Sequence, residues 1–242
     1  MGSEKPAEAF KAYKQLEETA TRASAPGSEA KCAEVAAELA AELNAETPPT
    51  KNEKGKEEPG KSKYSSTVRN KICRLLACVG GAKEVPALVK MIGELEVREM
   101  ARWSLDRNRS QAATDALIKA LEEVGTEFRV GVVGSLGKRK CAMAMAALQD
   151  VANADAEPEV RINAVEVLAN FPEPANADVI LKATQCACPL LSTRAWKAAV
   201  RLAENLRKAG KKSDAAALDR KIGSGAPAAQ KAAANIGLGA TN

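Results

Sequence analysis

The chain of 242 residues contains no histidine. Ser-His-Asp and Cys-His catalytic groups, and metal sites built on a pair of histidines, all need an imidazole, so the sequence excludes them. No paired carboxylates and no glycine-rich phosphate loop stand out either. We therefore expect no catalytic residue, no cofactor and no bound metal ion, and we expect a binding protein rather than an enzyme.

Cysteine is the other residue type with reactive chemistry. Three of the six cysteines fall inside predicted helices, where a small apolar thiol packs well. Only Cys186 and Cys188 are closely spaced, as Cys-x-Cys, so free cysteines in a reducing compartment are favoured over a four-cysteine zinc site. The full set is Cys32, Cys73, Cys78, Cys141, Cys186 and Cys188.

Charge and hydropathy narrow the class of protein further. The net charge of +5 is mildly basic and falls short of a composition dedicated to nucleic acid. The first ten residues have no apolar signal core, and no apolar run approaches transmembrane length. These features predict a soluble, cytoplasmic monomer with no membrane span, and they leave open a secreted or periplasmic mature form.

An apolar pattern at helical spacing recurs along most of the chain. Its copies are separated by 29, 31, 32 and 31 residues, and a second column of helices, centred on Leu88, Leu117, Leu148 and Ile180, is in phase with it. A helical repeat of about 30 residues is typical of a solenoid. The leading apolar residues of the copies are Val68, Val97, Phe128, Val160 and Leu191.

The remaining sequence suggests how the chain is divided. The stretch 45–63 is rich in Pro, Gly, Lys and Glu and has almost no apolar residue, so we expect a flexible charged loop or linker there. The Ala- and Gly-rich end predicts a frayed tail, with one short helix near 227–235. The expected parts are an N-terminal helical pair (1–44), the loop (45–63), the repeat array (64–222) and the tail (223–242).

An arginine follows the leading apolar residue in four of the five copies. Arginine in the first turn of a helix opposes the helix dipole and needs an acceptor, and the loops before these helices are acidic. The arginines are Arg69, Arg98, Arg129 and Arg161; Ser192 takes this position in the last copy, with Arg194 two residues later.

This arrangement resembles the HEAT repeat family, especially the short HEAT-like repeats of phycobilisome lyases. The resemblance implies an all-α fold, a right-handed α-solenoid (superhelix) of about five two-helix HEAT-like repeats. It also implies a structural arginine ladder, in which each arginine and an acidic turn residue tie neighbouring repeats together. We expect the ladder to fail at Ser192, and Arg161→Ala to affect stability more than binding.

Positions two and six residues after each leading apolar residue point away from the core, toward the expected concave face. An exposed apolar patch with a tryptophan at its centre is typical of a binding surface. The alternative is that Trp103 packs over a gap left by Gly134. The predicted partner-binding residues are Trp103, Val130, Gly134 and Ile162, flanked by Arg74 and Lys197.

The loops that join one repeat to the next are basic, which complements the helix dipoles and also suggests an edge for an anionic partner. We expect a non-catalytic scaffold that binds a protein partner through its concave face. Polyanion or nucleic-acid binding along the basic edge is the alternative, and a bilin lyase-like enzyme, implied by the resemblance, is third. The basic edge consists of Arg107, Arg109, Lys138, Arg139, Lys140, Lys211 and Lys212.

Overall fold

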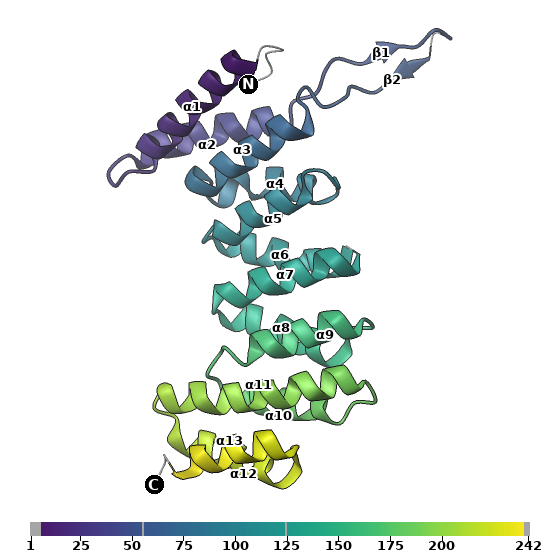
Figure 1. Cartoon of the computed structure of the whole chain (residues 1–242). Helices are drawn as coiled ribbons and strands as arrows, with labels where there is room; N and C mark the ends of the chain where they lie inside the picture. The colour runs from purple at the N-terminus through teal and green to yellow at the C-terminus, as the bar shows by residue number, and fades with distance from the viewer. Residues whose placement is uncertain (1–5, 55, 124, 240–242) are drawn as a thin grey trace. The chain divides into compact units, whose positions relative to one another are not determined.

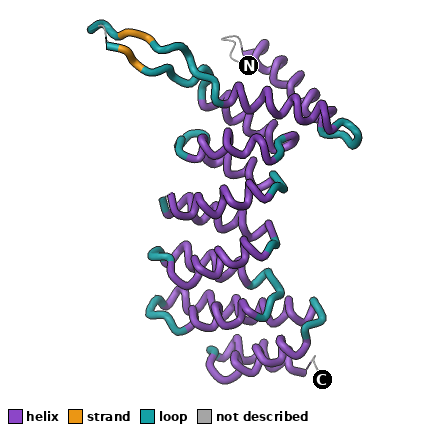
Figure 2. Tube along the Cα trace, turned by 180° about the vertical axis from the view of Figure 1, so that it is seen from behind, coloured by secondary structure: helices purple, strands orange, loops and turns teal. Residues whose placement is uncertain are grey.

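The computed structural model describes residues 6–54, 56–123 and 125–239. Within these ranges the chain is helical apart from one short hairpin, and consecutive helices pack as pairs (Figures 1 and 2). The fold is all-α and belongs to the α-solenoid class of repeated helix pairs, which confirms the prediction from periodicity. The chain forms two compact units, Met1–Ala120 and Leu121–Asn242, each with its own packed helices.

The first unit is built around the pair α3 and α5, which lie side by side. Helices α1 and α2 pack on α3, and α4 packs on α5. Ile72, Leu88 and Leu105 fill the core and are at most 1% exposed. The elements are α1 (Pro6–Ala23), α2 (Glu29–Leu43), β1 (Thr50–Lys51), β2 (Glu57–Glu58), α3 (Ser66–Val79), the 3-10 turn η1 (Ala82–Glu84), α4 (Val85–Ile92), α5 (Arg98–Arg107) and α6 (Gln111–Glu123), which continues into the second unit.

The segment between α2 and α3 contains a short β-hairpin, which the prediction of a flexible charged loop or linker does not include. Thr50 pairs with Glu58 in the antiparallel strands, and a further bridge joins Glu46 to Ser62. The Asn52 side chain accepts the backbone N–H groups of Lys54 and Lys56 and so closes the turn. The hairpin projects from the helices of its unit (Figures 1 and 2). Backbone pairing and one Asn turn thus form a hairpin in a segment that has almost no apolar residue.

The second unit has two layers of helices. Helices α7, α9 and α11 lie side by side in one layer, and α8 and α10 pack on each other and on these helices in the second. The leading residues Phe128, Val160 and Leu191 are at most 1% exposed. The elements are α7 (Thr126–Arg139), α8 (Ala142–Ala154), α9 (Pro158–Leu168), α10 (Ala175–Thr184), α11 (Pro189–Lys208), α12 (Lys212–Gly225) and α13 (Ala228–Gly239).

Proline marks the start of two of these helices. Pro158 and Pro189 occupy the first helical positions of α9 and α11. A backbone N–H at this position would have no acceptor within the helix, so proline loses no hydrogen bond there, and its fixed φ is close to the helical value. In the described residues, no helix is both long enough and apolar enough to cross a membrane.

The last described helix, α13, is packed and longer than the short helix expected near 227–235. Helix α13 packs on α12 and α11 and buries Ala234. Beside Gly237 lies an ion pair between Arg207 and Asp219, whose side chain is only 1% exposed. Burial raises the pKa of the Asp219 carboxyl, although the Arg207 guanidinium opposes this shift. The helix therefore covers a buried charged pair that would otherwise face water.

All six cysteines are free thiols. Cys73 is fully buried in α3, and this burial raises the pKa of its thiol to about 12, whereas Cys78 is exposed. Because the thiolate is the reactive form, only about one Cys73 in ten thousand would be reactive at pH 8. We expect iodoacetamide at pH 8 to alkylate Cys78 in the native protein and Cys73 only after urea is added, as read by peptide mass spectrometry. Equal rates at both positions would contradict the burial of Cys73.

Candidate protein-binding groove

Two of the predicted partner-binding residues line one groove in the first unit. Arg74 on α3 and Trp103 on α5 face a cavity of about 420 Å³. Glu99, Met100 and Arg102 complete its walls. We call this cavity the Trp103 groove.

The repeat places these side chains on the same face of neighbouring helices. Arg74 lies six residues after Val68, and Trp103 lies six residues after Val97. Val68 and Val97 are buried and hold the two helices against the core, so the residues six positions later point outward. Trp103 is half-buried and Arg74 is exposed. The two residues therefore meet as equivalent positions of consecutive repeats.

Arginine dominates the charge around the groove. The Arg107 guanidinium lies over the Trp103 ring at 5.0 Å from its centroid, a cation–π contact. The Nε of Arg102 donates to the Glu99 carboxylate at 2.9 Å. Arg74 and Arg102 line the groove beside Trp103, and Arg107 lies over the indole ring, so three guanidinium groups accompany the single lining carboxylate of Glu99.

Helix α1 adds charged groups on the α3 side. The Lys71 ammonium lies 5.0 Å from the centroid of the Tyr13 ring. Burial raises the pKa of Tyr13, the Glu17 carboxylate raises it further, and the positive charge of Arg74 opposes both. Arg74 therefore lies within electrostatic reach of α1, which packs along α3.

The other predicted partner-binding residues belong to the second unit. Val130 on α7 and Ile162 on α9 are half-buried, and Lys197 on α11 is exposed. A Cβ at Gly134 would meet no atom within 4 Å. The close helix approach in α7 lies at Gly137 instead, where a Cβ would come within 2.4 Å of Cγ1 of Val167 on α9. Gly134 is therefore not required by packing.

Arg69 and Arg129 each reach an acidic residue of the following repeat. Arg69 is buried and pairs with Glu94, in the loop before α5, at 2.5 Å. Arg129 pairs with Asp155, in the loop before α9, at 3.0 Å. Asp155 also accepts the backbone N–H of Glu157 at 2.9 Å and so shapes the turn. Arg98 is half-buried at the start of α5.

In the last two copies of the repeat, the residue that follows the leading apolar residue contacts its own repeat and not the next one. The Nε of Arg161 donates to the carbonyl of Ala152, near the end of α8 in its own repeat, at 3.1 Å. Ser192 does the same within its repeat, since its hydroxyl donates to the carbonyl of Thr184 at 2.6 Å. Arg194 instead pairs with Glu166 on α9 at 3.1 Å.

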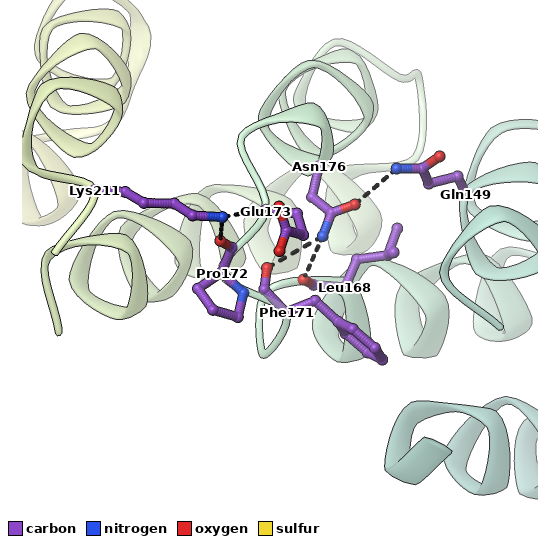
Figure 3. A network of polar contacts seen from close by, with 7 residues as sticks. All are labelled: Gln149, Leu168, Phe171, Pro172, Glu173, Asn176 and Lys211. Atoms are coloured by element: carbon purple, nitrogen blue, oxygen red, sulfur yellow. Dashed lines mark hydrogen bonds and ion pairs between the residues drawn. The ribbon is translucent and has the colours of Figure 1, made fainter. Parts of the chain in front are cut away.

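Most of the predicted basic edge is exposed at loops and helix ends. Lys140 ends α7 with φ of 49°, in the left-handed region that a lysine rarely adopts. Lys211 is engaged within the fold, because its ammonium donates to the carbonyl of Pro172 and to the Glu173 carboxylate, both at 2.8 Å (Figure 3). Arg107, Arg109, Lys138, Lys140 and Lys212 are exposed, and Arg139 is half-buried.

Asparagines form polar ties that the sequence analysis does not predict. The fully buried Asn176 donates to the carbonyls of Leu168 and Phe171 and accepts from Gln149 (Figure 3). Asn108 donates to the carbonyls of Gly80 and Gly81, and Asn205 to that of Ala169. Asn108 and Asn205 thus satisfy the carbonyls that end the second helix of the repeat before them. An asparagine near the end of a second helix is the signal that would have found them.

Comparison with known proteins finds only remote structural similarity. No protein-family profile and no curated protein sequence matches the chain. Among solved structures, the CpcE–CpcF complex of phycocyanin lyase from Nostoc sp. PCC7120 is 18% identical, with 99% of this chain and 91% of that chain covered, at a TM-score of 0.43. An engineered protein is 16% identical (74% and 92% covered, TM-score 0.40), and human deoxyhypusine hydroxylase in complex with glycerol is 15% identical (82% and 91%, 0.39).

Proposed function

We propose that this protein is a non-catalytic helical-repeat scaffold that binds a segment of a protein partner in the Trp103 groove. The observation that carries the proposal is a half-buried tryptophan in a cavity of about 420 Å³, with Arg74 and Arg102 in the lining and Arg107 over the indole ring. Tryptophan and arginine are the residues most enriched at the energetic centres of protein interfaces. Stacked repeats supply an extended surface on which such a centre can be placed.

The lining of the groove defines the chemistry of the partner. Trp103 and Met100 offer an apolar floor for one aliphatic or aromatic side chain. Arg74 and Arg107 offer donors to carboxylates, and each guanidinium can bind a carboxylate through two parallel hydrogen bonds. The partner segment is therefore acidic, with one apolar anchor.

A peptide selection tests this function. A phage-displayed library of random 12-residue peptides is selected against the full chain, and the enriched peptides are synthesised for binding measurements. We expect enrichment of Asp and Glu around an apolar residue, and a loss of affinity of at least about tenfold in Trp103→Ala. Trp196→Phe is the matched control, because Trp196 lies on α11 beside Gly225 and should leave binding unchanged.

A polyanion bound along the basic edge is the second candidate, supported by the exposed Lys138 and Lys140 at the end of α7. The same proteins separate the two functions. Equal peptide affinity in the wild type and in Trp103→Ala would contradict binding of the peptide in the Trp103 groove. Heparin binding that weakens steeply with salt and is lost when Lys138, Arg139 and Lys140 are replaced by alanine would then favour the basic edge.

A further inference from the structure

Another cavity in the first unit is lined by residues that do not belong to the Trp103 groove. It is formed between α1, α2 and α3 and has a volume of about 250 Å³. Its walls are aliphatic: Leu16 comes from α1, Val35 and Leu39 from α2, and Ile72 from α3. An aliphatic cavity with a few polar groups at its mouth is typical of a small-molecule site.

Two of the four polar side chains that line this cavity are acidic, and the other two are the hydroxyl-bearing Thr19 and Tyr64. Glu38 and Glu42 line it from consecutive turns of α2. Two carboxylates at this spacing lie on the same face of the helix and repel each other, which a bound cation would relieve. They are therefore placed to attract positive charge to the cavity.

One of these two carboxylates, that of Glu42, is already paired with a lysine of the same chain. Glu42 accepts the Tyr64 hydroxyl at 2.5 Å and the Lys63 ammonium at 3.1 Å. These two hydrogen bonds, that from Tyr64 being the stronger influence, lower the pKa of Glu42, so it is ionised at neutral pH. Glu38 forms no ion pair within the described part of the chain, and the nearby Lys31 pairs with Glu34 at 2.8 Å. One negative charge at the cavity is thus left over.

We propose that this cavity binds a small organic cation, an alkylamine, with its hydrocarbon chain among Leu16, Leu39 and Ile72 and its ammonium group beside Glu38 and Glu42. The aliphatic walls select an apolar body, and the surplus carboxylate selects a positive head over a neutral or negative one. This site is independent of the proposed function, since it shares no lining residue with the Trp103 groove.

Titration of the full chain with three six-carbon probes tests the proposal. Hexylamine, 1-hexanol and hexanoate have similar apolar chains and differ in the charge of the head group. We expect saturable ¹H–¹⁵N chemical-shift changes in α1, α2 and α3 with hexylamine, at a Kd of roughly millimolar order. Hexanol should bind about two- to fivefold more weakly, and hexanoate more weakly still.

Three variants provide the controls. Glu38→Gln should weaken hexylamine binding about two- to fivefold, whereas Glu34→Gln, on the same helix but outside the cavity, should not. Thr19→Phe places a ring into the cavity from the exposed side of α1 and should abolish binding of all three probes. If Thr19→Phe does not fold, the comparison of hexylamine affinity between Glu38→Gln and Glu34→Gln still tests the proposal. No saturable binding of hexylamine, or equal affinity for hexylamine and hexanol with no effect of Glu38→Gln, would overturn the proposal.

Discussion

Replacing Arg129 by alanine is expected to lower the free energy of unfolding by about 3 kcal/mol, because it leaves a buried carboxylate without its partner. The Asp155 side chain is 7% exposed, and the Arg129 guanidinium, 3.0 Å away, supplies its positive partner. The change also releases α7 from the loop that precedes α9. Urea denaturation followed by circular dichroism measures the loss.

Arg161→Ala is the matched control, since Arg161 occupies the same repeat position one copy later. Its Nε donates to the neutral carbonyl of Ala152, so its loss should cost only about 1 kcal/mol. A double-mutant cycle between Arg129 and Asp155 isolates the pair itself. Equal losses in the Arg129 and Arg161 variants, or no coupling in the cycle, would contradict a ladder that works through charge pairing.

Replacing Gly137 by alanine should have the second largest effect. The new Cβ would come within 2.4 Å of Cγ1 of Val167, and the β-branched valine in α9 has little rotamer freedom to move aside. We expect a loss of about 2 kcal/mol from forced separation of α7 and α9. Thermal and urea unfolding of the variant measure it.

The same helix contains the control for this prediction. A Cβ at Gly134 meets open space, so Gly134→Ala should raise the free energy of unfolding by about 1 kcal/mol through helix propensity alone. Adding Val167→Ala to Gly137→Ala should recover part of the loss. Stabilisation by both single alanine substitutions would show that α7 and α9 do not approach closely at Gly137.

The repeated helix pairs could be predicted because their signal is carried by large apolar residues at fixed spacing. Val97, Phe128 and Val160 each lie within three residues of the start of a second helix, and each is at most 1% exposed. Burial at intervals of about thirty residues leaves few alternatives to a stack of helix pairs. The fold class therefore follows from the core alone.

The hairpin and the packing of the last helix could not be predicted in this way, because neither depends on large apolar residues. The hairpin is held by backbone pairing and by the Asn52 turn. Helix α13 packs through the small residues Ala234 and Gly237. Small residues by themselves predict a frayed tail, because the sequence does not show that the Arg207–Asp219 pair lies against them. Amino-acid composition therefore does not reveal helices and strands that are held in place by backbone hydrogen bonds or by ion pairs.

The candidate site could be predicted only in part. Counting along the repeat identifies Arg74 and Trp103 as neighbours, because equivalent positions of packed helices face the same side. The count does not show that Arg107 turns back over the Trp103 ring, or that Lys211 is engaged by Glu173. Long, flexible side chains choose partners by three-dimensional proximity, which spacing in the sequence does not determine.

The ladder also connects stability to the proposed function. Arg69 on α3 pairs with Glu94, and Asn70 donates to the carbonyl of Glu96 at 2.9 Å, both in the loop that leads into α5. These contacts fix the position of α5 against α3, and the Trp103 groove lies between residues of these two helices. The groove is therefore preformed by contacts that lie outside it.

The most direct test of the account is the response of the two tryptophan indoles to a selected acidic peptide. The ¹H–¹⁵N spectrum contains one Nε1–H signal from each of Trp103 and Trp196, and Trp196→Phe assigns them. We predict that the Trp103 signal shifts and saturates with the peptide while the Trp196 signal stays in place. Saturable peptide binding that leaves the Trp103 signal unmoved would contradict the assignment of the groove as the binding site.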